Sequence, residues 1–202
     1  MTTETAHTMD NTGSRFGMWV FLFTEIMLFG GLFVLFAAYF NEYQTEFISG
    51  GKELDVIFGA ANTLILLTSS FTVAASITAI RKNEVKHALA LLWATIGLGA
   101  LFLVNKYFEW GHKFEHGIYP NSDKLNSGPV GENIFFGLYY IITGLHGLHI
   151  VIGLGALITA VILMKREKVT AEHYVFLENS GLYWHLVDLI WIFLFPLFYL
   201  VL

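Results

Sequence analysis

The sequence predicts an all-α integral membrane bundle of five transmembrane helices. Of its 202 residues, 55% are hydrophobic and only 13% are charged, whereas a soluble domain carries about 25% charged residues. Five long apolar runs approach or exceed the roughly 20 residues that cross about 30 Å of hydrocarbon, and polar connections separate them. The absence of cysteine excludes disulfides, thiolate metal sites and covalently attached c-type haem. The net charge of −5 and the lack of a basic patch give no indication of nucleic-acid binding.

The first two helices follow from apolar runs with polar boundaries. Residues 1–15 are polar and lack both a basic n-region and a small-residue cleavage site, so we expect a disordered tail rather than a signal peptide. A Phe-rich run then predicts a helix over about residues 16–40. The next apolar run predicts a helix over about residues 56–80, and the basic pair Arg81-Lys82 follows it.

The last three helices are predicted in the same way. A short polar connection leads to a third helix over about residues 87–108, and a long polar loop leads to a fourth over about residues 133–164. The fifth covers about residues 176–202, with Pro196 near its end. Neither an internal repeat nor a second domain is recognisable, so residues 16–202 are expected to form a single membrane domain.

The distribution of lysine and arginine predicts the orientation of the helices. The N-terminal tail and the second and fourth connections carry seven of the eleven Lys and Arg residues, whereas the other four lie in longer loops on the opposite side. Because positively charged short loops stay in the cytoplasm, we expect a cytoplasmic N-terminus and an outer C-terminus. Residues expected to form an aromatic belt at the span ends are Trp19, Tyr39, Tyr107, Trp110 and Tyr199.

Five ionisable side chains are predicted to lie well inside the membrane. The fourth helix carries His146 and His149, which are three residues apart and therefore on one side of the helix. Glu25 lies near the middle of the first helix, and the fifth helix carries His185 and Asp188 at the same spacing of three. Ionisable groups at membrane depth are costly and turn toward protein or water. These side chains are therefore expected to gather inside the bundle as an intramembrane polar network.

Some uncharged and peripheral residues are secondary candidates for the same region. Candidates for the polar network or for a lipid cleft are Asn62, Glu109, Trp184 and Trp191. Glycines expected to allow close contact between helices are Gly30, Gly31, Gly144 and Gly147. A ligand pocket lined by their backbone is the alternative.

Three interpretations of the polar network are open from the residues alone. Histidines and carboxylates three apart on facing helices are used by metal centres in bundle cores, and imidazole with carboxylate suits iron, zinc or copper. The usual Glu-x-x-His pairs are missing, however. Chains of glutamate and histidine also serve as proton relays in pumps. The residues favour the third interpretation, an interhelical hydrogen-bonded cluster that fixes helix packing, with each bond contributing about 1 kcal/mol or less.

Four motifs resemble those of subunit III of the haem–copper terminal oxidases. The stretch Thr143-Gly-Leu-His-Gly-Leu-His-Ile150 is similar to the T-G-x-H-G-x-H-V signature of that family. The stretch Tyr183-Trp-His-Leu-Val-Asp-Leu-Ile-Trp191 is similar to its W-H-F-x-D-x-x-W signature. Thr24-Glu25 resembles a Ser-Glu pair in a Phe-rich helix, and Lys106-Tyr-Phe-Glu109 resembles the Glu-Tyr region before a long outer loop. The motifs occur in the family's order and cover essentially residues 16–202.

The resemblance implies a non-catalytic subunit of a respiratory oxidase. Such a subunit binds neither haem nor copper, which lie in partner subunits, and it packs beside the catalytic subunit I, which reduces O2 to water and pumps protons. In the family it holds phospholipid, supports proton uptake and helps to keep the active site intact during turnover. Further partners to expect are subunit II, a small subunit IV and, in a supercomplex, an upstream quinol-oxidising complex. By position, Glu25 matches the family's buried glutamate, and the His/Asp pairs match its polar cluster.

The sequence also departs from the larger members of that family, which have seven helices. This chain begins at what would be their third helix, so the lipid cleft formed there is expected to be absent or completed by another subunit. The intramembrane histidines are too few to ligate two haems and a copper, so the chain cannot be the catalytic subunit. Two alternatives are a subunit III-like partner of a nitric oxide reductase and a freestanding membrane metal-dependent oxidoreductase using the same His, Glu and Asp side chains. The electron donor, cytochrome c or quinol, is a property of other chains.

Overall fold

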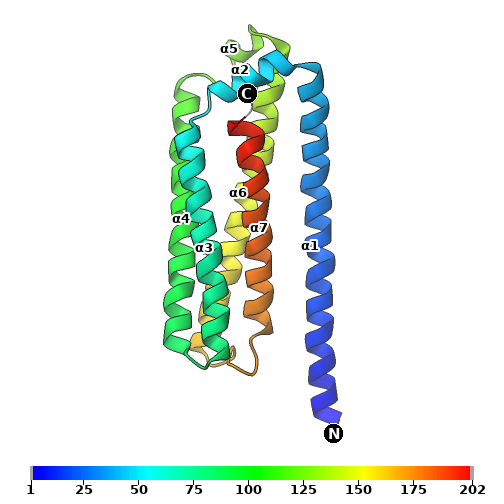
Figure 1. Ribbon diagram of the computed structural model, residues 1–202, viewed down its shortest axis with the longest axis vertical. Helices are drawn as coiled ribbons and strands as arrows, with labels where there is room; N and C mark the ends of the chain where they lie inside the picture. Colours follow the sequence, from blue (N-terminus) through cyan, green and yellow to red (C-terminus); the bar gives the residue numbers. More distant parts are fainter. Residues whose placement is uncertain (1, 201–202) are drawn as a thin grey trace.

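The computed structural model describes residues 2–200, with their side chains from residue 12 onward. These residues form seven helices and no strands. The helices are α1 (Thr2–Glu42), α2 (Gln44–Lys52), α3 (Val56–Arg81), α4 (Val85–Glu115), α5 (Asp123–Asn126), α6 (Val130–Lys165) and α7 (Val175–Tyr199). Within the described part, five helices are long and apolar enough to cross a membrane, and α2 and α5 are short helices in the connections. The predicted all-α class with five membrane spans is confirmed (Figure 1).

The helix boundaries differ from the predicted ones at two places. α3, α6 and α7 begin and end within about three residues of the expected positions. α4 continues for nearly two turns beyond residue 108, because one side of this segment, which carries Lys106, Glu109 and Lys113, is buried against other helices. α1 begins at Thr2, inside the stretch for which we expected a disordered tail. Residues 12–15 of that stretch are helical, and Ser14 and Arg15 contact α7.

Ion pairs and hydrogen bonds join α1 to the bundle at its N-terminal end. Arg15 Nη2 lies 2.7 Å from Oε2 of Glu178 in α7. Nη2 of Arg81 in α3 lies 2.8 Å from Oε1 of the same carboxylate. Asn179 Nδ2 donates to Ser14 Oγ at 3.0 Å. The two arginine side chains are about half exposed, so each pair contributes about 1 kcal/mol or less. Their main effect is to fix where α1 meets α7.

The long helices form a four-helix bundle with a fifth helix alongside. α3, α4, α6 and α7 make up the bundle, and α1 lies against its α6–α7 side (Figure 1). α2 crosses one end of the bundle between α1 and α3 and contacts α6. The N- and C-terminal ends of the chain lie at opposite ends of the bundle (Figure 1), as an odd number of spans requires. Which side of the membrane each end faces stays a prediction.

The short connections that close the bundle follow from local sequence. Asp55 is the N-cap of α3, and its Oδ1 accepts from the backbone N–H of Ile57 at 2.8 Å and of Phe58 at 3.3 Å. Asn83 follows the end of α3 with a positive φ of 61°, a conformation that asparagine tolerates better than most residues. The resulting turn is only three residues long, which keeps α3 and α4 antiparallel and in contact along their length.

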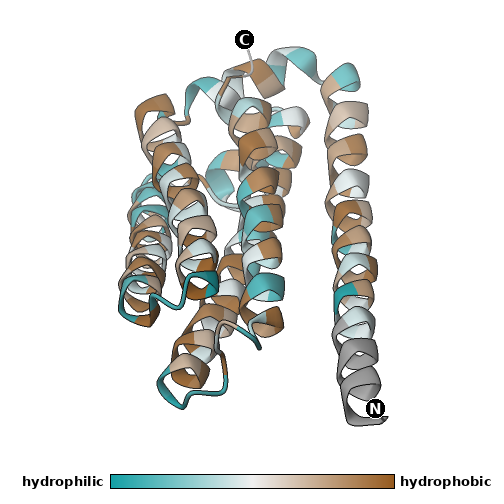
Figure 2. Cartoon of the chain, turned by 60° about the horizontal axis from the view of Figure 1, so that its bottom comes forward, coloured by the Kyte–Doolittle hydropathy of each residue, from teal (hydrophilic) through white to brown (hydrophobic). Residues whose placement is uncertain are grey.

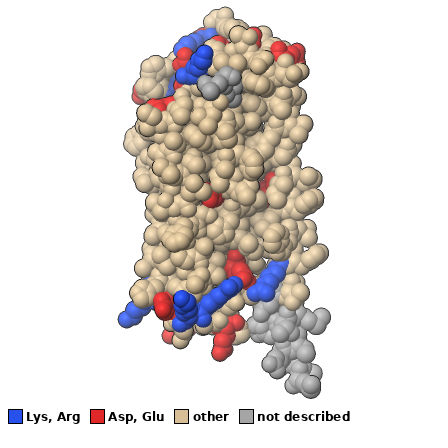
Figure 3. Space-filling model, viewed as in Figure 1, with Lys and Arg blue, Asp and Glu red and all other residues tan. Residues whose placement is uncertain are grey.

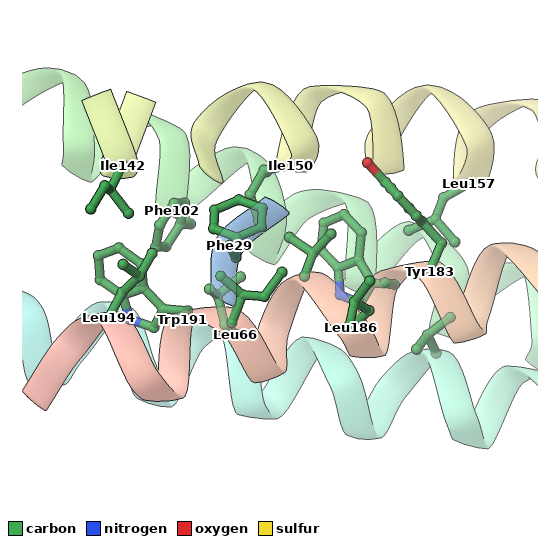
Figure 4. Close-up of a cluster of buried hydrophobic side chains, with 14 of the residues drawn as sticks. Phe29, Leu66, Phe102, Ile142, Ile150, Leu157, Tyr183, Leu186, Trp191 and Leu194 are labelled. Atoms are coloured by element: carbon green, nitrogen blue, oxygen red, sulfur yellow. The ribbon is translucent and has the colours of Figure 1, made fainter. Parts of the chain in front are cut away.

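The core between the helices is aromatic and aliphatic, and glycines allow large rings to pack closely within it. Residues labelled in the core close-up are Phe29, Leu66, Phe102, Ile142, Ile150, Leu157, Tyr183, Leu186, Trp191 and Leu194 (Figure 4). The indole of Trp184 lies against Gly99 of α4 and Gly153 of α6, where a Cβ would come within 2.6 and 2.8 Å of the ring. Of the glycines expected to allow close helix contacts, Gly30, Gly31 and Gly147 do not do so within this chain, because a Cβ there would meet nothing within 4 Å. At Gly144 a Cβ would lie 3.2 Å from the Trp110 ring of α4, so this glycine does allow a close contact between helices.

The outer surface has the distribution of polarity that a membrane protein needs. Large apolar side chains of α1 face outward, among them Phe16, Trp19, Phe23, Met27 and Val34. Hydrophobic residues dominate the long helices, and hydrophilic residues gather in the connections (Figure 2). On the face shown in Figure 3, charged side chains cluster at the two ends, and the band between them is almost uncharged except for two small acidic patches. This band is the part of the molecule suited to hydrocarbon.

Candidate functional site

Glu25 of α1 and His149 of α6 form a pair within the membrane-spanning part of the bundle. The two side chains are 13% and 9% exposed, and Glu25 Oε2 lies 2.8 Å from His149 Nε2. The other ring nitrogen, Nδ1, lies 2.8 Å from the carbonyl oxygen of Leu145, one turn earlier in α6. Because a carbonyl oxygen only accepts hydrogen bonds, Nδ1 carries a hydrogen. The ring is therefore oriented with Nε2 toward the carboxyl group of Glu25.

This geometry places one proton between the two side chains. A neutral ring accepts a hydrogen bond at Nε2 from protonated Glu25, and an imidazolium ring donates one to the carboxylate. Both forms have the same total charge, so the pair avoids the cost of an isolated charge at membrane depth. Phe29 packs edge-on against the His149 ring at 5.3 Å, and Tyr183 OH donates to the His149 carbonyl oxygen at 3.3 Å. The site can hold a proton where water has little access.

His146 lies one turn away from His149 but has different neighbours. Its side chain is fully buried, and neither ring nitrogen has a hydrogen-bond partner in the described chain. The ring packs edge-on against Phe102 of α4 at 5.6 Å and lies 5.2 Å from the Trp191 ring of α7. The structure therefore does not bring His146 into the pair that Glu25 forms with His149. Its contacts are those of an aromatic core residue.

His185 and Asp188 form a separate group with α3. His185 Nδ1 lies 2.6 Å from Ser70 Oγ, and Asp188 lies beside the same serine. Asp188 is 4% exposed, and its Oδ1 has no hydrogen-bond partner in the described chain. The five side chains expected to gather as one network are thus divided among an α1–α6 pair, an α3–α7 group and an isolated histidine.

The secondary candidates also link helices. Trp184 Nε1 donates to Ser69 Oγ at 2.9 Å, and Trp191 Nε1 donates to Thr63 Oγ1 at 3.0 Å, so both tryptophans join α7 to α3. Both are essentially buried within the bundle, and neither faces a lipid cleft at the surface of this chain. Asn62 of α3 accepts from Asn105 Nδ2 of α4 at 3.0 Å.

Glu109, the remaining secondary candidate, belongs to a charged cluster at the α2 end of the bundle. The Lys106–Glu109 cluster consists of Lys106 and Glu109 of α4, Tyr139 of α6 and Tyr199 of α7. Lys106 Nζ donates to Glu109 Oε2 at 3.1 Å and to the two tyrosine hydroxyls at 3.0 and 2.8 Å. Both hydroxyls in turn donate to Glu109 Oε1 at 2.6 Å. The cluster therefore joins three helices through buried, charge-assisted hydrogen bonds.

Three members of this cluster were missed from the sequence. Lys106 was counted among the charges of an outer loop, and Tyr199 was assigned to the aromatic belt, yet they are 7% and 3% exposed. Lysine near the end of an apolar run often extends toward water, but Lys106 turns into the bundle. The available signal was the Lys-x-x-Glu spacing, which places Lys106 and Glu109 on one side of α4. Nothing comparable indicated Tyr139.

Most of the intramembrane histidines use their ring nitrogens for hydrogen bonds within the protein and not for metal coordination. Among the side chains that the structure describes, no three histidine, aspartate or glutamate residues lie where they could hold a metal ion together. His149 uses both ring nitrogens, on Glu25 and on the Leu145 carbonyl. His185 uses one on Ser70. The chemistry open to the set is hydrogen bonding and proton binding.

Comparison with known proteins relates this arrangement to one family. The family described as "Cytochrome c oxidase subunit III" matches residues 1–201. The chain belongs to this family. Cytochrome c oxidase subunit 3 of Thermostichus vulcanus is 33% identical over 187 residues, which cover 91% of this chain and 85% of the relative. Quinol oxidase subunit 3 of Bacillus spizizenii is 30% identical over 188 residues, with 91% and 85% covered.

A third relative carries two subunit names in one protein. Heme-copper oxidase subunit I+III of Aeropyrum pernix is 31% identical over 198 residues, which cover 93% of this chain and 22% of that protein. Membership of the subunit III family confirms the resemblance that the sequence motifs indicated. It favours a subunit of a terminal oxidase over a freestanding metal-dependent oxidoreductase. The matched relatives include both cytochrome c oxidases and quinol oxidases.

Proposed function

We propose that this chain is the non-catalytic subunit III of a proton-pumping respiratory haem–copper oxidase in a bacterial cytoplasmic membrane. It stabilises the catalytic subunit I, supports proton uptake into it and binds phospholipid. Haem and copper are held by partner subunits. Subunit II, a small subunit IV and an upstream quinol-oxidising complex are further partners that the proposal includes.

The observation that carries the proposal is the Glu25–His149 pair in a member of the subunit III family. The pair holds a proton between α1 and α6, shielded by Phe29 and close to the outward face of α1. A proton-binding pair at this position can exchange protons with a neighbouring subunit packed against α1. The joined subunits I and III in the Aeropyrum pernix relative support such close association.

The role of the other polar groups in this proposal is structural. The α3–α7 group and the Lys106–Glu109 cluster each join helices through hydrogen bonds. His146 contributes packing between α4, α6 and α7. These contacts give the subunit a rigid face on which a catalytic partner can be held.

Purification of the chain from its native host tests the assignment. The chain would be tagged and purified in mild detergent, and the reduced-minus-oxidised visible spectrum, metal content and O2 consumption would be measured before and after the partners are stripped. We expect haem, copper and O2 consumption to co-purify with the tagged chain and to leave with the partners. Stoichiometric metal on the isolated chain would contradict the proposal, because the histidines would then have to be metal ligands.

A further inference from the structure

A cavity of about 580 Å³ opens where the end of α2 meets α3 and α4. It contains none of the five intramembrane residues discussed above. Its lining is divided between charged side chains from the α2–α3 connection and the end of α4, and two phenylalanines, Phe58 and Phe108. An amphipathic cavity of this kind needs a ligand with both a polar and an apolar part.

The position of the cavity along the helices matches the edge of a bilayer. α4 has 31 residues, so it is about 46 Å long and exceeds the roughly 30 Å of hydrocarbon in a bilayer. The last turns of α4, which contain His112 and Lys113, therefore project into the headgroup layer. Phe108 lies about one turn deeper and is 64% exposed, and Phe58 on α3 is 43% exposed. The apolar part of the cavity faces the acyl chains.

The polar part of the cavity carries charges of both signs. Lys52 and Lys113 supply two ammonium groups, and Lys113 is fixed at the wall because its Nζ donates to the Glu53 carbonyl oxygen at 3.0 Å. Glu53 and Asp55 supply two carboxylates, and the third carboxylate of the lining, Glu109, is already bound by Lys106 and two tyrosine hydroxyls. Both capping bonds of Asp55 use Oδ1, so its Oδ2 is an additional acceptor. A purely anionic ligand would meet these carboxylates, whereas a zwitterion can satisfy both signs.

We propose that this cavity binds a zwitterionic phospholipid with a primary amine in its headgroup, that is, a phosphoethanolamine lipid. Its phosphate binds Lys52 and Lys113, its ammonium donates to Glu53 and Asp55, and its acyl chains lie along Phe58 and Phe108. A choline headgroup has no N–H to donate, and a glycerol headgroup has no positive charge. The site lies between α2, α3 and α4, on a different side of the chain from α1. It rests on the proposed membrane location, but its readout is lipid retention and not oxidase activity.

The test compares three lipids that differ only in headgroup. The intact oxidase complex would be purified and exchanged into mixed micelles containing phosphatidylethanolamine, phosphatidylcholine and phosphatidylglycerol with identical acyl chains. Native mass spectrometry would then measure the lipid retained per complex.

The variant that tests the site combines Lys52→Gln with Asp55→Asn, because asparagine preserves the N-cap of α3. We expect the wild type to retain phosphatidylethanolamine selectively and the variant to lose that retention about three- to tenfold. Lys124→Gln, an exposed lysine at the same end outside the cavity, is the control and should retain lipid as the wild type does.

A photoreactive phenylalanine analogue at the exposed position Phe108 identifies the occupant directly. Cross-linking to phosphatidylethanolamine in the native membrane would support the site. Cross-linking to another protein chain would overturn it, because the cavity would then be part of a subunit interface. Equal retention of the three lipids, or unchanged retention in the Lys52/Asp55 variant, would also overturn it. Each of these results is independent of whether the complex reduces O2, so they are distinguishable from a failure of the proposed function.

Discussion

The Lys106–Glu109 cluster shows how a single chain keeps a charged pair inside an apolar bundle. Lysine has three N–H donors, and those of Lys106 find Glu109 and the hydroxyls of Tyr139 and Tyr199. Each hydroxyl accepts from the lysine and donates to the carboxylate. A buried ion pair is tolerated only when such additional hydrogen bonds satisfy its remaining donors and acceptors.

Removing one partner of this cluster should therefore be costly. Glu109→Ala leaves Lys106 buried without an anionic partner, and we expect the free energy of unfolding to fall by about 3–5 kcal/mol. The double variant Lys106→Met/Glu109→Leu should regain most of that loss, because it replaces the pair with apolar side chains. Denaturation by SDS from mixed micelles measures both. Glu115→Ala, an exposed glutamate of the same helix, should change stability by less than about 0.5 kcal/mol. Equal stability of Glu109→Ala and Glu115→Ala would contradict the account.

At the scale of whole helices, the position of α7 is set by one large side chain between two glycines. Trp184 lies against Gly99 of α4 on one side and Gly153 of α6 on the other, and its Nε1 is held by Ser69 of α3. All three neighbouring helices therefore fix the same indole.

A methyl group at Gly153 tests this arrangement. Its Cβ would lie 2.8 Å from Trp184 Cε3, closer than real carbon atoms approach, so Gly153→Ala should lower stability by about 1–3 kcal/mol through overpacking. Gly155→Ala is the matched control on the same helix, because a Cβ there meets nothing within 4 Å. Thermal unfolding of the purified complex, followed by loss of this subunit, would compare the two. If both variants unfold at the wild-type temperature, Trp184 is not confined as described.

At the scale of the whole molecule, the orientation in the membrane is a prediction that the absence of cysteine makes easy to test. Single cysteines would be introduced at two exposed lysines at opposite ends of the bundle, Lys124 after α4 and Lys168 after α6. A membrane-impermeant maleimide added to intact cells should label Lys124→Cys and not Lys168→Cys, because the side richer in Lys and Arg stays in the cytoplasm. Labelling of both variants after the membrane is disrupted is the control. The reverse pattern in intact cells would require the opposite orientation.

The sequence was sufficient for the membrane spans but not for the partners of their polar side chains. Apolar runs of about 20 residues can only be helices in a bilayer, so α3, α6 and α7 were located closely. His146 and His149 differ by one turn, yet one packs against α4 and α7 and the other pairs with α1. Small differences in angle around a helix decide which neighbour a side chain meets, and these depend on the packing of all five spans. For the same reason, the glycines that mediate close contact could not be chosen from composition alone.

The proposed role of this subunit requires that the Glu25–His149 pair acts in the oxidase complex and not only in folding. Glutamine at position 25 can still hydrogen bond to His149 but cannot hold the shared proton. Glu25→Gln should therefore leave the complex assembled but slow its proton uptake. If the pair had only a structural role, the substitution would leave the kinetics of the assembled complex unchanged. Glu42→Gln, an exposed glutamate at the end of the same helix, is the matched control.

The most direct test is the rate of proton uptake and the rate of inactivation during sustained O2 reduction. Both would be measured on oxidase purified with the wild-type chain, with Glu25→Gln, with Glu42→Gln and without this chain. We predict full haem and copper content in all four preparations, with slower proton uptake and faster inactivation in the Glu25→Gln complex and in the complex without the chain. Wild-type proton uptake and an unchanged inactivation rate in the Glu25→Gln complex would contradict the proposed role of this subunit.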